Sequence, residues 1–111
     1  MKNKILSFLC AGVIFPVSAA FIQEGPTIMD IIDVKDLADD TPVVIQGNII
    51  QKIDKDKYLF RDNTDEIIVE IDDKAWNKVD VRTEDTVQLV GETDKDFSET
   101  KIEVDQVIKV K

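Results

Sequence analysis

The chain has 111 residues, of which 43% are hydrophobic and 33% are charged, and its formal net charge at pH 7 is -9. This length allows one small globular domain and excludes a second. The acidity disfavours binding to phosphate backbones and anionic lipid surfaces, and the absence of histidine removes the usual general base and the imidazole metal ligand.

The first twenty residues have the layout of a cleavable secretory signal peptide. Lys2 and Lys4 precede an apolar run over residues 5–15, and small residues surround the predicted cleavage point after Ala19 or Ala20. The run is too short to cross a bilayer as a stable helix, so we expect no membrane span after cleavage. An uncleaved anchor and a lipoprotein attached through Cys10 are the alternatives, and the bulky residues before Cys10 argue against the lipoprotein.

Cleavage would change the inventory of reactive groups and the charge. Cys10 is the only cysteine, so the mature chain would have no disulfide, no thiolate ligand and no cysteine nucleophile. Loss of Lys2 and Lys4 reduces the basic residues from 14 to 12 while all 23 acidic residues remain, which moves the net charge from -9 to -11. A domain without cross-links must depend on its hydrophobic core.

The predicted domain covers residues 30–111 and begins with a helix. Residues 21–29 have no periodicity and contain a Gly-Pro pair, so we interpret them as a flexible lead-in. Asp30 is placed to cap a helix of about two turns whose apolar stripe includes Ile31, Val34 and Leu37. Pro42 ends that helix, because the residue before a proline is pushed out of the helical region.

Three strands follow, separated by polar turns. The first covers residues 43–53 and is interrupted by Gly47, which predicts a bulge or a sharp bend. The turn at 54–57 leads into a second strand at 58–61, and the turn at 62–66 leads into a third at 67–72. The third strand alternates between apolar and polar residues, so one of its faces should be buried.

A short helix and two more strands complete the chain. Asp72 or Asp73 should cap a helix that contains Trp76, whose indole would plug the end of the core. Strands at 86–93 and 100–110, with a turn at 94–98 and a shift of register near Gln106, complete the pattern. This order predicts a mainly β fold: a five-stranded Greek-key OB-fold barrel with a short helix between strands 3 and 4 and an N-terminal helix. A two-layer sandwich is the competing architecture.

From Gly47 to Trp76 the sequence resembles the bacterial OB-fold (BOF) family of small periplasmic proteins, a domain of unknown function. The resemblance extends over nearly all of the mature chain. It is carried by these segments: residues 39–43 (DDTPV), 47–49 (GNI), 58–62 (YLFRD), 69–72 (VEID), Trp76, 91–92 (GE) and 94–96 (DKD). It implies a cleaved signal, a periplasmic location, an OB barrel and a role in envelope stress tolerance, with cell-wall sugars as ligands of some relatives. It supplies no catalytic residues.

The sequence offers little support for catalysis, for calcium binding or for nucleic-acid binding. We expect no enzyme, no catalytic residue and no cofactor, because Ser98 is the only mature serine and has no base to activate it. The acidic turns at 62–66 and 94–99 lack the spacing of a dedicated calcium loop, so we expect no metal site, with calcium binding kept as an alternative. Nucleic-acid binding would need a basic groove with aromatic platforms, which the acidic strands do not provide.

The remaining prediction is a binding protein. OB barrels bind ligands across strands 2 and 3 and the flanking loops, and most outward residues there are expected to be acidic. We therefore expect a cationic small molecule, a cationic peptide or a cell-wall glycan as the partner. The candidate ligand-binding residues are Tyr58, Arg61, Asp62, Glu70, Asp72, Asp94 and Asp96. For Arg61 and Asp62 a structural ion pair with a neighbouring strand is the alternative, and a purely structural module is the alternative for the whole chain.

Overall fold

The computed structural model describes residues 27–97 and 99–110. The predicted signal peptide at 1–20 and residues 21–26 of the lead-in lie outside the described residues. The elements are α2 (Ile31–Val34), β2 (Pro42–Lys52), β3 (Lys57–Arg61), β4 (Glu66–Glu70), α3 (Asp73–Trp76), β5 (Val87–Asp96) and β6 (Glu99–Lys109). In this part of the chain no helix is long and apolar enough to cross a membrane.

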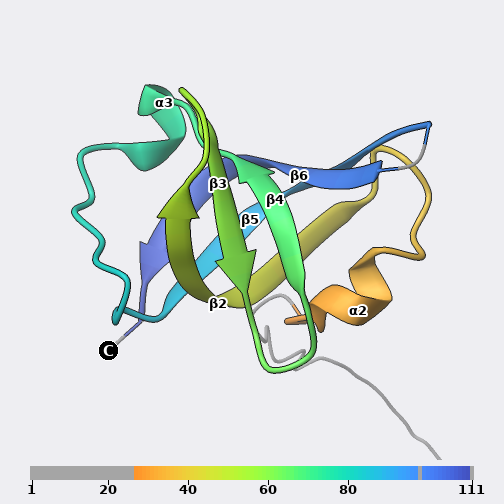
Figure 1. Cartoon of the computed structure of the whole chain (residues 1–111), viewed down its shortest axis with the longest axis horizontal. Coiled ribbons are helices and arrows are strands. Elements are labelled where there is room, and N and C mark those ends of the chain that lie inside the picture. The colour runs from red at the N-terminus through yellow and green to blue at the C-terminus, as the bar shows by residue number, and fades with distance from the viewer. Residues whose placement is uncertain (1–26, 98, 111) are drawn as a thin grey trace, which may run out of the picture.

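The five strands close into a barrel in the order β2-β3-β4-β6-β5, and β5 pairs in turn with β2. All neighbouring pairs are antiparallel except β4 and β6, which run parallel. Figure 1 shows α3 and α2 at opposite sides of this barrel. The predicted five-stranded barrel, with its short helix between the third and fourth strands, is confirmed.

The first strand of the barrel, β2, changes partner at a glycine. Residues up to Gly47 pair with β5, and residues from Asn48 onward pair with β3. A Cβ atom on Gly47 would lie 2.1 Å from the carbonyl oxygen of Arg61, so only glycine fits where the two strands close together. The expected bend is therefore present, and the bulge itself follows at Ile50, where the register with β3 shifts.

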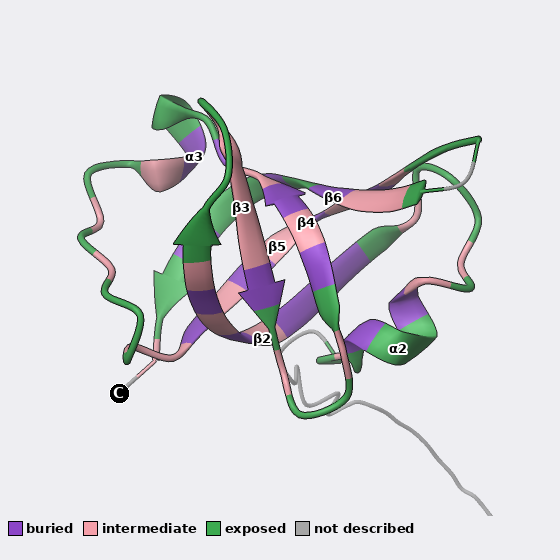
Figure 2. Ribbon diagram, in the orientation of Figure 1, coloured by how far each residue is buried: buried purple, intermediate pink, exposed green. Residues whose placement is uncertain are grey.

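The core fills the inside of the barrel, and buried positions alternate with partly exposed ones along much of the strands in Figure 2. Its fully buried side chains include Phe60, Ile45, Ile71, Leu89 and Ile102. Thr93 is buried with them, yet its hydroxyl donates to the carbonyl of Ala38 at 2.6 Å and accepts from the N–H of Thr41 at 2.9 Å. Since both bonds are made, its burial carries no unsatisfied group.

The N-terminal helix is shorter than its apolar stripe predicts. Helix α2 has four residues, of which Ile31 and Val34 are buried while Ile32 is 52% exposed. Asp30 occupies the N-cap position but makes no side-chain cap bond. Asp62 from the β3–β4 turn accepts from the N–H of Ile31 at 2.9 Å instead. The packing of this turn against α2, rather than local sequence, supplies the cap.

The second half of the chain differs from its prediction in one turn. Strand β5 continues to Asp96, which pairs with Glu99 of β6, so the turn is shorter than the expected 94–98. The ladder runs through polar residues because backbone hydrogen bonds do not depend on side-chain polarity. The predicted register shift is present, with Asp105 as the extra residue before Gln106. Asp72 caps α3 as expected, and its Oδ1 accepts from the N–H of Ala75 at 2.8 Å.

Candidate functional site

The two aromatic residues of β3 point to the inside of the barrel. Phe60 is fully buried, and Tyr58 is half-buried and packs against the same core. The ring of Tyr58 meets that of Trp76 edge to face, with centroids 5.5 Å apart. The outer face of β3 therefore lacks the aromatic platform on which nucleic-acid bases stack in other OB barrels.

Arg61 and Asp62 take part in contacts within the fold. The Arg61 guanidinium lies 3.6 Å from the carboxylate of Glu66, its partner on β4, and both side chains are largely exposed. Asp62 accepts hydrogen bonds from Ile31, Thr64 and Asp65. Partial burial would raise the pKa of Asp62, but the hydrogen bonds from Thr64, Ile31 and Asp65 outweigh it and hold this pKa below its ordinary value. Both residues thus stabilise the β3–β4 region.

The outer side of β3 and β4 is mixed rather than mainly acidic, in contrast to the expectation. Leu59 and Ile68 are cross-strand partners at its centre, and both are half-buried. The pairs at the two ends of the ladder join opposite charges, Arg61 with Glu66 and Lys57 with Glu70. The charge of this face is therefore largely balanced, because each basic residue of β3 has an acidic partner on β4.

A row of three glutamates crosses the neighbouring strands. Glu103 of β6 pairs with Glu70 of the parallel strand β4 on one side and with Glu92 of the antiparallel strand β5 on the other. All three point outward, because the alternate residues Val69 and Ile102 are buried. Like charges directly opposite on a sheet are destabilising. We call Glu70, Glu103 and Glu92 the acidic row.

Lys101 is the cation that accompanies this row. Its Nζ lies 3.5 Å from Glu70 and 3.7 Å from Asp94, and its side chain is only 14% exposed. Burial lowers the pKa of Lys101, but the carboxylates of Glu70, Asp94 and Asp96 raise it by more, so this pKa lies above its ordinary value. Loss of hydration raises the pKa of Glu103, and Asp94 and Glu70 raise it more. The single positive charge of Lys101 therefore does not neutralise the carboxylates of the acidic row.

An acidic groove adjoins the row. Two cavities on the barrel surface have mainly polar walls, one of about 390 Å³ and the other of about 310 Å³. The smaller of these two is the acidic groove. Its lining is Asp56, Glu70, Asp72, Glu103, Val104 and Asp105. Every charged residue of this lining is acidic, so the groove attracts cations.

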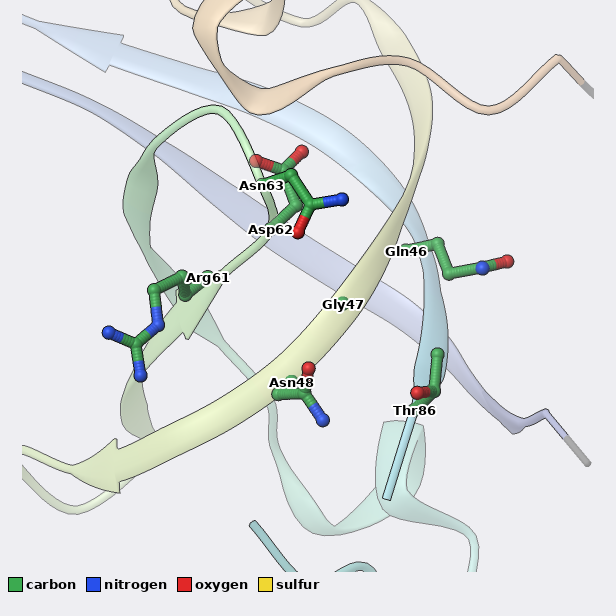
Figure 3. A pocket seen from close by; sticks show the side chains of 7 residues that line it. All are labelled: Gln46, Gly47, Asn48, Arg61, Asp62, Asn63 and Thr86. Atoms are coloured by element: carbon green, nitrogen blue, oxygen red, sulfur yellow. The ribbon is translucent and has the colours of Figure 1, made fainter. Parts of the chain in front are cut away.

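The larger polar cavity lies over Gly47 and contains Arg61 and Asp62 (Figure 3). Its amide groups are mostly engaged. Asn48 donates to the carbonyls of Thr83 and Asp85, at 3.1 and 2.9 Å, and Gln46 accepts from Gln88 at 2.9 Å. Because these groups already have partners, this cavity has fewer free donors and acceptors than its lining suggests.

The structure brings together some of the predicted residues and adds others. Glu70, Asp72 and Asp94 lie at or beside the acidic row, Asp96 lies farther along β5, and Tyr58 packs, half-buried, against the core beside Trp76. Glu92 and Glu103 were not among the predicted site residues. Their alternation with buried residues indicates that they point outward, but only the parallel pairing of β4 with β6 brings Glu103 next to Glu70.

Comparison with known proteins agrees with the fold. Protein YgiW of Escherichia coli K12 is 47% identical over 76 residues, which cover 68% of this chain and 58% of YgiW. The match thus spans less than two thirds of YgiW. Calcium-regulated OB-fold protein CarO of Pseudomonas aeruginosa is 40% identical over 116 residues, which cover both chains completely.

Solved structures give the same result. The structure of YgiW from E. coli has a TM-score of 0.75 at 41% identity and covers 79% of this chain and all of that chain. An OB domain of MM0293 from Methanosarcina mazei has a TM-score of 0.63 at 14% identity, covers 78% of this chain and 86% of that one, and shows the fold alone.

The strand order and the short helix α3 between β4 and β5 define a small OB-fold barrel. Residues 16–109 match the family described as bacterial OB fold (BOF) protein. The chain belongs to this family.

Proposed function

We propose that this protein is a non-enzymatic binding protein of the periplasm. It binds cationic ligands, such as polyamines or cationic peptides, and so contributes to envelope stress tolerance. The observation that carries the proposal is the acidic row of Glu70, Glu103 and Glu92, which continues into the acidic groove. A bound cation would relieve the repulsion between these carboxylates. The periplasmic address rests on the predicted signal peptide.

The distribution of charge supports an organic cation over a calcium ion. Carboxylate oxygens of Glu70, Asp94 and Glu103 lie within 4.8 Å of one another, but the ammonium group of Lys101 lies among them. Lys101 already supplies a positive charge at the place where a calcium ion would need several oxygens. CarO is named as calcium-regulated, so calcium belongs in the test as a competitor.

The same surface argues against nucleic acid as the ligand. The carboxylates of the row would repel a phosphate backbone. The aromatic side chains of β3 point inward, and the centre of its outer face is Leu59 with Ile68. This arrangement offers neither the basic groove nor the stacking platform that single-stranded nucleic acid requires.

The test is a calorimetric titration with spermidine, a lysine-rich peptide, a muropeptide, calcium chloride and single-stranded DNA. We expect spermidine and the peptide to bind, with an affinity that falls as salt is added, because salt screens exposed charges. The variant Glu70→Gln with Glu103→Gln should weaken this binding by about tenfold or more, since each lost charge contact is worth on the order of 1 kcal/mol.

The matched control is Asp33→Asn with Asp36→Asn, which removes the same charge from two exposed residues outside the row. We expect it to bind like the natural chain. Binding that responds equally to both double variants would show that net charge alone attracts the ligand. Binding of DNA, of calcium alone or of the muropeptide alone would refute the proposal.

A further inference from the structure

A further cavity lies near α3, and it differs in chemistry from the acidic groove. It is a cleft of about 240 Å³ between the end of β2, helix α3 and the segment at 81–83 that precedes β5. Tyr58 and Trp76 line it together with the aliphatic side chains of Ile49, Ile50 and Val81. We call it the aromatic cleft.

The two aromatic residues of the cleft are joined to each other by a hydrogen bond. The planes of Tyr58 and Trp76 meet at 81°, and the indole Nε1 donates to the Tyr58 hydroxyl at 3.3 Å. Both side chains are half-buried, so part of each ring remains accessible. An apolar ligand that covers the rings would therefore leave the hydrogen bond of the indole N–H in place.

The charged residues at this cleft are both cationic. Lys52 Nζ lies 5.7 Å from the centre of the Tyr58 ring, and Arg82 lies on the segment that forms another wall. Neither side chain forms an ion pair with a carboxylate in residues 27–97 and 99–110. The backbone hydrogen bond from Arg82 holds the pKa of Asp85 below its ordinary value, and the charges of Lys109, at 3.5 Å, and of Arg82 also lower it.

The cleft is held in shape by contacts outside it. Asn48 on β2 donates two hydrogen bonds to the carbonyls of Thr83 and Asp85 and so fixes the segment that carries Arg82. The capping bond from Asp72 fixes the start of the helix that carries Trp76. A cleft formed before the ligand arrives avoids part of the entropic cost of ordering its walls.

We propose that the aromatic cleft binds a small apolar carboxylate, with the apolar group against Tyr58 and Trp76 and the carboxylate between Lys52 and Arg82. Two local cations are needed because the chain as a whole carries a charge of -9 and repels anions at a distance. The same repulsion favours a singly charged carboxylate over a doubly charged phosphate. The apolar group is required because it is the part that the rings recognise.

Trp76 is the only tryptophan of the chain, so its fluorescence reports directly on this cleft. The experiment titrates the full chain with octanoate, octanol and octylamine below their micelle concentrations. We expect octanoate to give a saturable change in emission. Octanol lacks the charge, and octylamine carries the opposite charge. Both should bind with an affinity at least about tenfold lower than that of octanoate, as expected for the loss of a charge-assisted contact.

The variant Lys52→Gln with Arg82→Gln should lose about tenfold or more in octanoate affinity. The control Lys55→Gln with Lys74→Gln removes the same charge from two exposed residues that do not line the cleft, and it should bind as the natural chain does. Circular dichroism and the melting temperature establish that both variants fold. Spermidine binding at the acidic row should be unchanged in both, which separates this proposal from the proposed function.

Three results would overturn the proposal. The first is the absence of any saturable change with octanoate, and the second is equal affinity for octanol and octanoate. The third is an octanoate affinity that the Lys52→Gln with Arg82→Gln variant retains in full.

Discussion

Asp62 shows how one side chain can connect two parts of the barrel. Its Oδ2 accepts from the N–H of Ile31 at the start of α2, and its Oδ1 accepts from the N–H groups of Thr64 and Asp65 in its own turn. A charged acceptor with several backbone donors is among the stronger hydrogen-bonding arrangements in proteins. The residue therefore serves the fold.

Replacement of Asp62 by alanine should destabilise the protein. We expect the free energy of unfolding to fall by about 1–3 kcal/mol, because the donors of α2 and of the turn lose a charged acceptor. Asp62→Asn should lose less, since the amide oxygen can still accept. Urea denaturation of both variants gives the measurement. Asn63→Ala, a change at the exposed neighbouring residue, is the control and should be close to neutral. Equal stability of Asp62→Ala and Asn63→Ala would contradict this role.

The pH dependence of the Asp62 contribution follows from the sign of its pKa shift. Its folded pKa is lowered, so the stabilisation is complete above the unfolded pKa and is lost as the pH falls through the folded pKa. The difference in stability between the natural chain and Asp62→Ala should therefore shrink under acidic conditions.

At the scale of the elements, two glycines lie where a side chain would clash with the backbone of a neighbouring strand. Gly91 on β5 resembles Gly47 on β2 in this respect, since a Cβ atom at Gly91 would lie 2.1 Å from the carbonyl oxygen of Glu103. Neither glycine has a positive φ angle. Space, and not backbone conformation, is therefore the reason for glycine at both positions.

Gly91→Ala should separate β5 from β6 at the position next to the register shift. Because the obstructing atom belongs to the backbone, relief requires movement of a strand, and we expect a loss of about 2 kcal/mol or more in the free energy of unfolding. Thermal and urea denaturation would measure it. Val90→Ala, at the adjacent outward position, is a control for the strand and should cost less. A Gly91→Ala variant as stable as that control would refute the steric explanation.

At the scale of the whole molecule, the distribution of charge matters more than its sum. The net charge of -9 could be spread evenly, but the register of β4, β6 and β5 concentrates carboxylates in the acidic row. The aromatic cleft carries two cations. A single small barrel thus presents two regions of opposite local charge, and the two proposed ligands differ accordingly.

The row should weaken the fold at neutral pH. The folded pKa of Glu103 is raised, so its ionisation costs stability as the pH rises from the unfolded to the folded pKa, and this cost persists at neutral pH. Glu103→Gln should raise the melting temperature at pH 7 by on the order of 2 °C. Well below the ordinary glutamate pKa of about 4.3, where Glu103 is protonated in both the folded and the unfolded chain, the difference should diminish. An unchanged or lower melting temperature at pH 7 would contradict the repulsion.

Patterns along the chain were sufficient for the elements of this protein and for its fold class. The alternation of apolar residues located the strands, Gly47 predicted a bulge or bend in β2, and the cap of α3 was narrowed to Asp72 or Asp73, of which the structure has Asp72. These features depend on neighbours within a few residues, and local sequence records such neighbours directly. The resemblance to a known family pointed to the same barrel.

Only the tertiary structure decided which distant residues meet. The apolar stripe of residues 31–38 predicted a longer helix, but the fold supplies its cap from Asp62, 31 residues away. Glu103 lies beside Glu70 because β4 and β6 pair in parallel after a long excursion of the chain. Periodicity shows which face a side chain takes, but the neighbour across a strand depends on register and closure of the barrel. The acidic row and the aromatic cleft both arise from that closure.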